Sequence, residues 1–188
     1  QEVLLEKCCK GEESSEQEVF TRVAFAVAQV EKTAELRERW FEAFEAKNPN
    51  VSIVTSPFQA AALPSNYADL VMLNLNYHDT YWQSEKYGIP KMDPDAFLKA
   101  VYAAMKPGGV IGVIDHVASP SPDTRATVEK FHRIDPAVVK ADFKRAGFQF
   151  AGSSDILRNP ADDHSLLVFD PKIRGKTDRF LFKFKKPR

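Results

Sequence analysis

Residues 69–76 have the sequence DLVMLNLN, and residues 110–114 have the sequence VIGVI. Both segments are short and almost continuously apolar, as the buried strands of a parallel sheet are. Between them, Asp93-Pro94 offers an N-cap followed by a proline at the first helical position, and Lys106-Pro-Gly-Gly109 offers a helix end. A strand, a helix and a strand in this order predict one unit of a parallel α/β sheet.

The chain on either side of this unit continues the alternation. Upstream, residues 23–30 (VAFAVAQV) and 51–55 predict strands, and Thr33 and Asn48-Pro49 mark the start and the end of a helix between them. Downstream, Asp135-Pro136 repeats the cap signal. The late strands are predicted at residues 148–153, 166–169 and 179–185, the last two as an antiparallel pair. These elements predict one α/β domain over residues 1–188, with a mainly parallel sheet and an antiparallel C-terminal strand pair.

The composition fits one folded domain. Of the 188 residues 44% are hydrophobic, and 26 basic side chains balance 26 acidic ones. Such a chain buries enough apolar surface to fold, and no run of 18 apolar residues predicts a membrane span. The basic segment 172–188 could meet nucleic acid, but residues 179–185 (RFLFKFK) alternate apolar and basic side chains as a half-exposed strand does. We therefore expect neither a membrane nor a nucleic acid as partner.

Polar and aromatic side chains follow the predicted strands. They are Glu31-Lys32, residues 56–58 (SPF), residues 74–79 (NLNYHD) and Asp115-His116. In an open α/β sheet, ligands bind outside the carboxyl ends of the strands. Structural alternatives exist: Glu31 as a solvated residue of a first helical turn, Phe58 as a core side chain and His116 as a buried histidine. Residues 74–79 are the strongest candidate, because so many polar groups at the mouth of a buried strand need partners.

Six further motifs in order resemble one family. They are residues 76–82 (NYHDTYW), 106–109 (KPGG), 114–116 (IDH), 131–136 (FHRIDP), 157–162 (LRNPAD) and 168–178 (VFDPKIRGKTD). With residues 68–71 (ADLV), this pattern is similar to class I S-adenosylmethionine-dependent methyltransferases, from about Val23 to the C-terminus. The closer resemblance is to a group of predicted bacterial methyltransferases of unassigned substrate. It implies a Rossmann-like sandwich, S-adenosylmethionine as cofactor and a small-molecule acceptor.

The resemblance also implies roles for individual residues. The cofactor contacts that it implies come from Glu31 at the ribose hydroxyls, Ser56 and Phe58 at the adenine, and Asn74 and Asn76. It implies Tyr77, His78 and Asp79 as catalytic residues, with a substrate side formed by Trp82, Asp115 and His116. A histidine has an ordinary pKa of about 6.5, so His78 is the candidate base, oriented by Asp79 or Asp115. For an acceptor that is a soft sulfur or an amine, no base is required and His78 would serve positioning.

The chain departs from the family at the glycine-rich turn after the first strand. Residues 3–5 are the candidate first strand, and between them and the segment 14–20 stands only Gly11. In the family, the glycines of this turn let the backbone approach the cofactor, but here the side chains of Cys8, Cys9 and Lys10 stand in that place. We therefore interpret residues 1–22 as a divergent or incomplete first unit, and cofactor binding is in question. Three explanations stay open: a divergent loop that binds, a lost site, or a missing upstream part, since the chain begins at Gln1. The adjacent cysteines form no zinc site on their own, and the sequence predicts no metal.

Three functions compete. The first is a methyltransferase acting on a small molecule, and the second is a catalytically silent binding or scaffold protein on the same fold. A nicotinamide-dependent oxidoreductase is the third, but it needs the missing Gly-x-Gly-x-x-Gly turn. Tyr81-Trp82 and Tyr87 either close over substrate or pack against a second copy of the chain in a homodimer. Residues 1–10 lack the apolar core of a targeting signal, so a cytoplasmic protein is the default, with export through a removed signal as the alternative.

Overall fold

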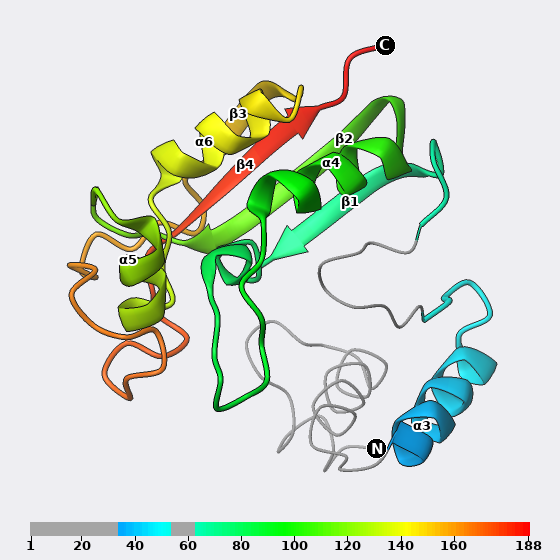
Figure 1. Ribbon diagram of the computed structural model, residues 1–188, viewed down its shortest axis with the longest axis horizontal. Coiled ribbons are helices and arrows are strands. Elements are labelled where there is room, and N and C mark those ends of the chain that lie inside the picture. The colour runs from blue at the N-terminus through cyan, green and yellow to red at the C-terminus, as the bar shows by residue number, and fades with distance from the viewer. Residues whose placement is uncertain (1–33, 54–62) are drawn as a thin grey trace. The chain divides into compact units, whose positions relative to one another are not determined.

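The computed structural model describes residues 34–53 and 63–188, which belong to two compact units, residues 1–55 and 56–188. The strands predicted at residues 3–5 and 23–30 lie outside the described residues. In the first unit, helix α3 (Ala34–Lys47) begins directly after the predicted cap Thr33 (Figure 1). It ends where Asn48-Pro49 predicts, since the Asn48 side chain donates to the carbonyl of Phe44 over 2.8 Å.

The strand predicted at residues 51–55 is not formed where it can be seen. Residues 51–53 are irregular, and residues 54–55 lie outside the described part of the chain. The reason is local, because the backbone N–H of Ile53 donates to the carboxylate of Glu45 in α3 rather than to a neighbouring strand. The prediction of one domain over residues 1–188 stays a prediction.

In the described residues of the second unit, four strands form a sheet in the order β1-β2-β4-β3. The strands are β1 (Ala68–Asn74), β2 (Met105–His116), β3 (Gln149–Ser154) and β4 (Arg179–Lys185). Strands β1 and β2 pair in parallel, while β4 pairs antiparallel to both β2 and β3. Within the described residues the sheet is therefore mixed, which corrects the prediction of a mainly parallel sheet.

In the part of this unit that the structure describes, three α-helices and one 3-10 helix connect the strands. They are η1 (His78–Tyr81), α4 (Pro94–Ala104), α5 (Thr124–Phe131) and α6 (Pro136–Arg145). Helices α4 and α6 contact each other and lie over the same face of the sheet (Figure 1). The Asp-Pro signals are confirmed, because Asp93 and Asp135 both cap their helices through a side-chain oxygen and a proline follows each. Helix α5 was not among the predicted elements.

The antiparallel pair of late strands exists with a different partner. Residues 166–169 form no strand, and β4 pairs instead with β3 and β2. The backbone of the predicted strand is committed elsewhere, because the carbonyl of Leu166 accepts from Nε of Arg133 over 3.0 Å. The N–H of Val168 donates to the carbonyl of Phe131 over 3.2 Å. The prediction of a strand at residues 166–169 is therefore wrong.

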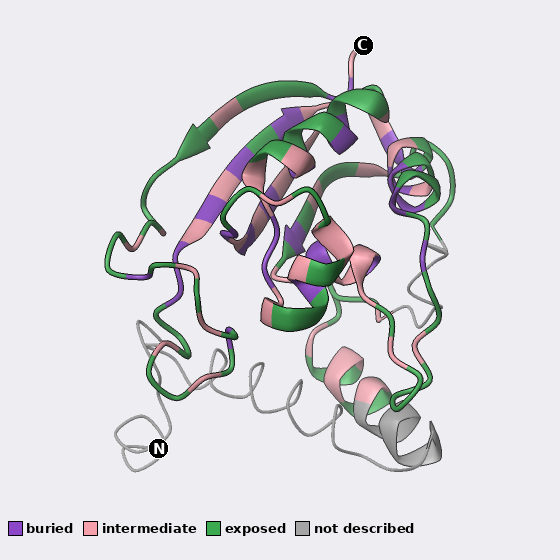
Figure 2. Cartoon of the chain, turned by 60° about the vertical axis from the view of Figure 1, so that its left-hand side comes forward, coloured by how far each residue is buried: buried purple, intermediate pink, exposed green. Residues whose placement is uncertain are grey.

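The core lies between the sheet and the helices α4 and α6. Buried side chains alternate with partly buried ones along β2 and β4, as Figure 2 shows for the strands. On β4 the buried positions are Phe180, Phe182 and Phe184, and on β2 Ile111 and Val113 are fully buried. The next position on that face of β2 is Asp115, which is 0% exposed. A carboxylate therefore ends the apolar row.

The Lys-Pro-Gly-Gly segment belongs to β2 rather than to the helix end. Helix α4 stops at Ala104, and the pairing of β1 with β2 jumps from Ala68–Met105 to Leu70–Val110. At Gly109 an added Cβ would lie 2.8 Å from the carbonyl oxygen of Lys106 and 3.2 Å from that of Asp69. Only glycine allows this approach of three backbone segments. Among the helices in the described ranges, none combines the length and the apolar character that crossing a membrane requires.

Candidate active site

The carboxyl ends of β1 and β2 lie side by side because the two strands are parallel. The chain leaves β1 through Leu75, whose φ of 56° is left-handed and whose N–H donates to the carbonyl of Ile114 over 2.9 Å. This sharp turn directs the chain into η1, which begins at His78. The sheet thereby brings residues 76–79 next to Asp115 and His116, as the sequence predicts.

His78 and Asp115 form a buried pair. Nδ1 of His78 lies 2.7 Å from Oδ1 of Asp115, and the backbone N–H of His78 donates to Oδ2 over 2.9 Å. The His78 side chain is 5% exposed. Burial lowers the pKa of His78, but the charge and hydrogen bond of Asp115 outweigh burial, with help from Asp79, so the pKa lies above its ordinary value. With Nδ1 held by the carboxylate, Nε2 is the ring atom that faces the site.

Asp79 and His132 complete a small cluster around Nε2 of His78. Oδ1 of Asp79 lies 3.3 Å from Nε2 of His78 and 3.8 Å from Nδ1 of His132. The two imidazole rings meet edge to face, with centroids 5.6 Å apart. His132 also packs against Trp82, with ring centroids 4.9 Å apart. Trp82, predicted on the substrate side, therefore forms one wall of this cluster.

The sequence predictions did not assign a role to His132. It occupies the C-cap of α5 with φ 50° and ψ 47°, a left-handed conformation that is uncommon outside glycine. Its backbone N–H donates to the carbonyl of Val128 over 2.8 Å. In the sequence His132 belongs to the 131–136 motif, but nothing in that motif distinguishes it as a site residue. Only the fold shows that it lies near η1.

Tyr77 points into the core rather than toward this cluster. It is fully buried and its hydroxyl donates to Oδ2 of Asp142 in α6 over 2.8 Å, and Tyr81 donates to the same oxygen over 2.6 Å. Burial and the Asp142 charge raise the pKa of the Tyr77 phenol far above its ordinary value. These contacts tie η1 to α6, so Tyr77 positions the site residues. A catalytic role for Tyr77 stays a prediction.

His116 faces Thr177 and not the cluster. Its Nδ1 lies 2.8 Å from the Thr177 hydroxyl, and its ring centroid lies 6.0 Å from that of His78. Burial lowers the pKa of His116 to about 4, which keeps the ring neutral near pH 7. His116 therefore sits beside the site as a neutral hydrogen-bonding group, and its substrate role stays a prediction.

The predicted cofactor residues have different surroundings. Asn74 is exposed at the end of β1, and Asn76 has a buried Oδ1 without a hydrogen-bond partner among the described residues. An orphaned buried acceptor of this kind suits a bound ligand that donates a hydrogen bond. Glu31, Ser56 and Phe58 lie outside the described residues, so their roles stay predictions.

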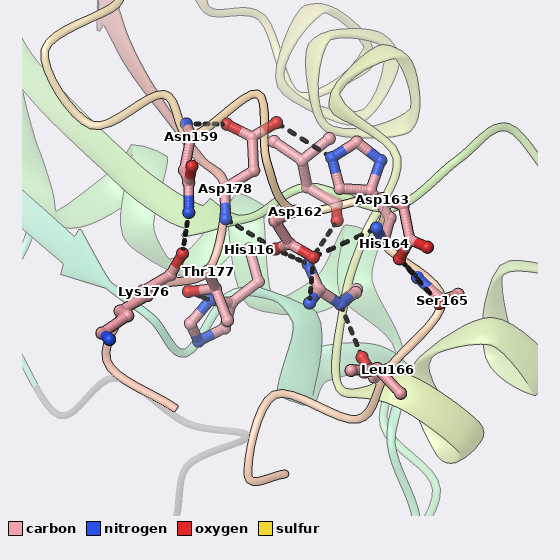
Figure 3. A network of polar contacts seen from close by, with 12 residues as sticks. His116, Asn159, Asp162, Asp163, His164, Ser165, Leu166, Lys176, Thr177 and Asp178 are labelled. Carbon is pink, nitrogen blue, oxygen red and sulfur yellow. Dashed lines mark hydrogen bonds and ion pairs between the residues drawn. The ribbon is translucent and has the colours of Figure 1, made fainter. Parts of the chain in front are cut away.

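A second polar network fixes the loops behind the site. Arg133, which is fully buried, donates two hydrogen bonds to the carboxylate of Asp162 over 2.8 and 3.0 Å. Asp178 accepts from Arg158 over 2.7 and 2.9 Å. It also accepts from the N–H of Asn159 and from His164, as Figure 3 shows. The N–H of Asp178 in turn donates to Asp162 over 2.7 Å. This network joins the 131–136, 157–162 and 168–178 motifs, and it holds Thr177 next to His116.

A hollow of about 630 Å³ lies next to η1, whose Tyr81 forms part of its lining. Its lining is formed by Tyr81, Gln83, Ser84, Glu85, Ile89, Pro90, Lys91, Arg125, Ala126 and Glu129. None of the described residues that were predicted as site residues belongs to this lining. The guanidinium of Arg125 is committed to the carbonyls of Tyr81 and Met92, so it braces the hollow rather than offering a free cation.

The solved structures that resemble this chain are mostly S-adenosylmethionine-dependent methyltransferases. One is a suggested sarcosine dimethylglycine methyltransferase from Galdieria sulphuraria, 13% identical, with a TM-score of 0.56 over 82% of this chain and 66% of that one. Another is the [4+2]-cyclase SpnF, 14% identical, with a TM-score of 0.54 over 89% of this chain and 71% of that one. At these identities the likeness shows a methyltransferase-like α/β fold alone.

A third similar structure is a methyltransferase from Aquifex aeolicus, 14% identical, with a TM-score of 0.48. The match covers 78% of this chain and 60% of that one, so the chain spans about three fifths of that protein's length. No family model and no curated protein matches the sequence.

Proposed function

We propose that the protein is an S-adenosylmethionine-dependent methyltransferase acting on a small-molecule acceptor. One observation carries the proposal: the buried His78–Asp115 pair lies where two parallel strands end, and the Oδ1 of Asn76, two residues before His78, is buried without a partner among the described residues. In open α/β sheets this edge is the ligand-binding edge. The likeness of the fold to methyltransferases supports the same assignment.

Two asparagines of the second unit are the proposed cofactor contacts among the described residues. Asn76 offers a buried acceptor and Asn74 an exposed amide, whereas the cofactor roles of Glu31, Ser56 and Phe58 stay predictions from the sequence. When bound, S-adenosylmethionine supplies an electrophilic methyl group. The chain's own task is to orient the acceptor and to remove its proton where the acceptor has one of high pKa.

His78 is the proposed base. Asp115 holds Nδ1, which fixes the ring and stabilises its charged form, so Nε2 is free to take a proton. Asp79, 3.3 Å from Nε2, stabilises the protonated ring in the same way. For an acceptor that needs no base, the same pair would serve positioning.

Calorimetric titration of the full chain with S-adenosylmethionine and S-adenosylhomocysteine tests the proposal. We expect saturable heat and a thermal shift, weakened in Asn76→Ala and unchanged in Lys106→Ala. Lys106 is a fair control because its exposed ion pair with Asp69 lies at the opposite end of β2. Absence of heat and of any thermal shift at millimolar ligand refutes the proposal.

A second candidate is a catalytically silent binding protein on the same fold. The observation that favours it is the single glycine, Gly11, where methyltransferases have a glycine-rich turn. The fold also resembles that of a protein described as a [4+2]-cyclase, SpnF, and one fold can serve different functions. The fold alone therefore does not require methyl transfer. Cofactor binding without product S-adenosylhomocysteine across a panel of small acceptors would favour this candidate.

A further inference from the structure

Three side chains at the mouth of the site present metal-binding atoms to one another. One nitrogen each of His78 and His132 and one carboxylate oxygen of Asp79 all lie within 4.8 Å of each other. The shorter separations are those of Asp79 Oδ1 from the two histidines, 3.3 and 3.8 Å. Two imidazoles and a carboxylate form a donor set that suits divalent transition metals and leaves coordination positions open.

The surrounding residues hold His78 as a metal ligand would be held. Its Nδ1 is bonded to the fully buried carboxylate of Asp115, which leaves Nε2 directed at Asp79. A carboxylate on the far nitrogen of a ligating histidine fixes the tautomer and makes the ligand more basic. Both oxygens of Asp115 are fixed as well, because the N–H groups of His78 and His116 donate to them.

Among the described residues, no lysine or arginine forms an ion pair with Asp79. In the ranges that the structure describes, Asp79 makes ion-pair contacts with His78 and His132 only. Arg133, which directly follows His132 in the sequence, is fully committed to Asp162 and to the carbonyls of Val117 and Leu166. The carboxylate of Asp79 is therefore available to a bound cation.

Aromatic side chains enclose the third ligand. The ring of His132 packs against Trp82 and Phe169, with centroids 4.9 and 5.3 Å apart. Its backbone is held in the left-handed region at the end of α5. These contacts preset the ring, which lowers the entropy cost of binding an ion.

We propose that His78, Asp79 and His132 bind one divalent transition-metal ion, with Asp115 as the group that orients His78. The site does not depend on methyl transfer, and it takes ions that accept nitrogen and oxygen donors, such as Zn²⁺ or Co²⁺. An ion on Nε2 excludes the proton-accepting role given to His78 above, so each molecule has one or the other.

The test uses the full chain without cofactor, after a chelator has removed any bound metal. Calorimetry measures the binding of Zn²⁺, and visible absorption measures the binding of Co²⁺. We expect one ion per chain and cobalt bands typical of nitrogen and oxygen ligands. His132→Asn removes the imidazole while asparagine tolerates the left-handed backbone, and it should weaken binding at least about tenfold. Asp115→Asn should weaken binding by about 10- to 100-fold.

The double variant Cys8→Ser/Cys9→Ser is the matched control: the two thiols form no complete zinc site on their own, but a cysteine thiolate is a zinc ligand and its contribution to the measured binding has to be removed. It should retain the affinity of the wild-type chain. Binding that is lost in this control and kept in His132→Asn overturns the proposal, as does no binding at millimolar Zn²⁺. Since no cofactor is present, these outcomes are independent of the fate of the methyltransferase proposal.

Discussion

Arg133 carries a full charge in the protein interior, and its partner Asp162 is equally buried. Replacing Arg133 with methionine keeps much of the apolar stem but leaves the Asp162 carboxylate without its cation. We expect Arg133→Met to lower the free energy of unfolding by about 3–5 kcal/mol, because an unpaired buried charge is left behind. Urea unfolding followed by circular dichroism measures the change.

The control for this prediction is Lys106→Ala, which breaks the Asp69 pair at the surface, where the two side chains are 45% and 80% exposed. Exposed pairs contribute about 0–1 kcal/mol, so this variant should unfold almost as the wild type does. Equal losses in the two variants would contradict the assignment of Arg133 as a structural cation.

Individual residues also show how far the candidate site could be predicted from the sequence. His78 and Asp115 could be found because each directly follows a predicted strand, and parallel strands bring their ends together. His132 follows a helix that the pattern did not predict, so nothing in the sequence placed it beside His78. The family resemblance implies Tyr77 as catalytic, which stays a prediction; the sequence could not show that its hydroxyl is bonded to Asp142 of α6, 65 residues away.

At the scale of elements, the helices begin where their capping residues stand. The side chain of Asp93 accepts from the N–H of Asp95 over 3.0 Å at the start of α4. Asp93→Ala should destabilise the protein by about 1 kcal/mol, because one N–H of the first turn loses its acceptor. Asp93→Ser keeps an acceptor and should restore most of the loss in a thermal unfolding measurement. The same loss in both variants would show that the cap is not the cause.

Strand β4 is the element on which the core depends most. Phe184 is 1% exposed, and its ring stacks on Phe143 of α6 with centroids 4.3 Å apart. Phe184→Ala should lower the free energy of unfolding by about 3–5 kcal/mol, since a large cavity opens between the sheet and α6. Chemical denaturation measures this loss.

Phe150 on the neighbouring strand β3 is the matched control. It is 49% exposed and its ring lies 5.5 Å from that of Phe184, so the same substitution there removes far less buried surface. We expect Phe150→Ala to cost less than half as much as Phe184→Ala. A reversed order would mean that the core does not lie on the α6 side of the sheet.

Capping residues and apolar periodicity are local, and they predicted α4, α6, β1 and β4 closely. Pairing is not local, which is why the partner of β4 was wrong. Residues 166–169 are as apolar as a strand requires, but their backbone serves the buried Arg133 and the end of α5. A pattern within the segment holds no information about a side chain 33 residues away.

For the whole second unit, the carboxylates of the loop network link stability to pH. Burial opposes the ionised form of Asp178, but hydrogen bonds from Arg158, Asn159 and His164 outweigh burial and lower the pKa of Asp178 to about 2. The pKa of Asp162 is lowered as well, against its burial, chiefly by Arg133. Both carboxylates are therefore harder to protonate in the folded chain than in the unfolded one.

The sign of the pH dependence follows from this direction. A carboxyl whose pKa is lower in the folded state contributes its full stabilisation above the unfolded value of about 3.9, and it loses this as the pH falls toward about 2. For Asp178 the contribution is about 2–3 kcal/mol, at 1.36 kcal/mol for each pH unit between the two values. Asp178→Asn should therefore be less stable than the wild type near pH 7, with the difference shrinking as the pH falls below about 4. Urea unfolding at a series of pH values measures it, and a difference that stays constant down to about pH 2 would mean that the Asp178 charge does not hold the three loop motifs together.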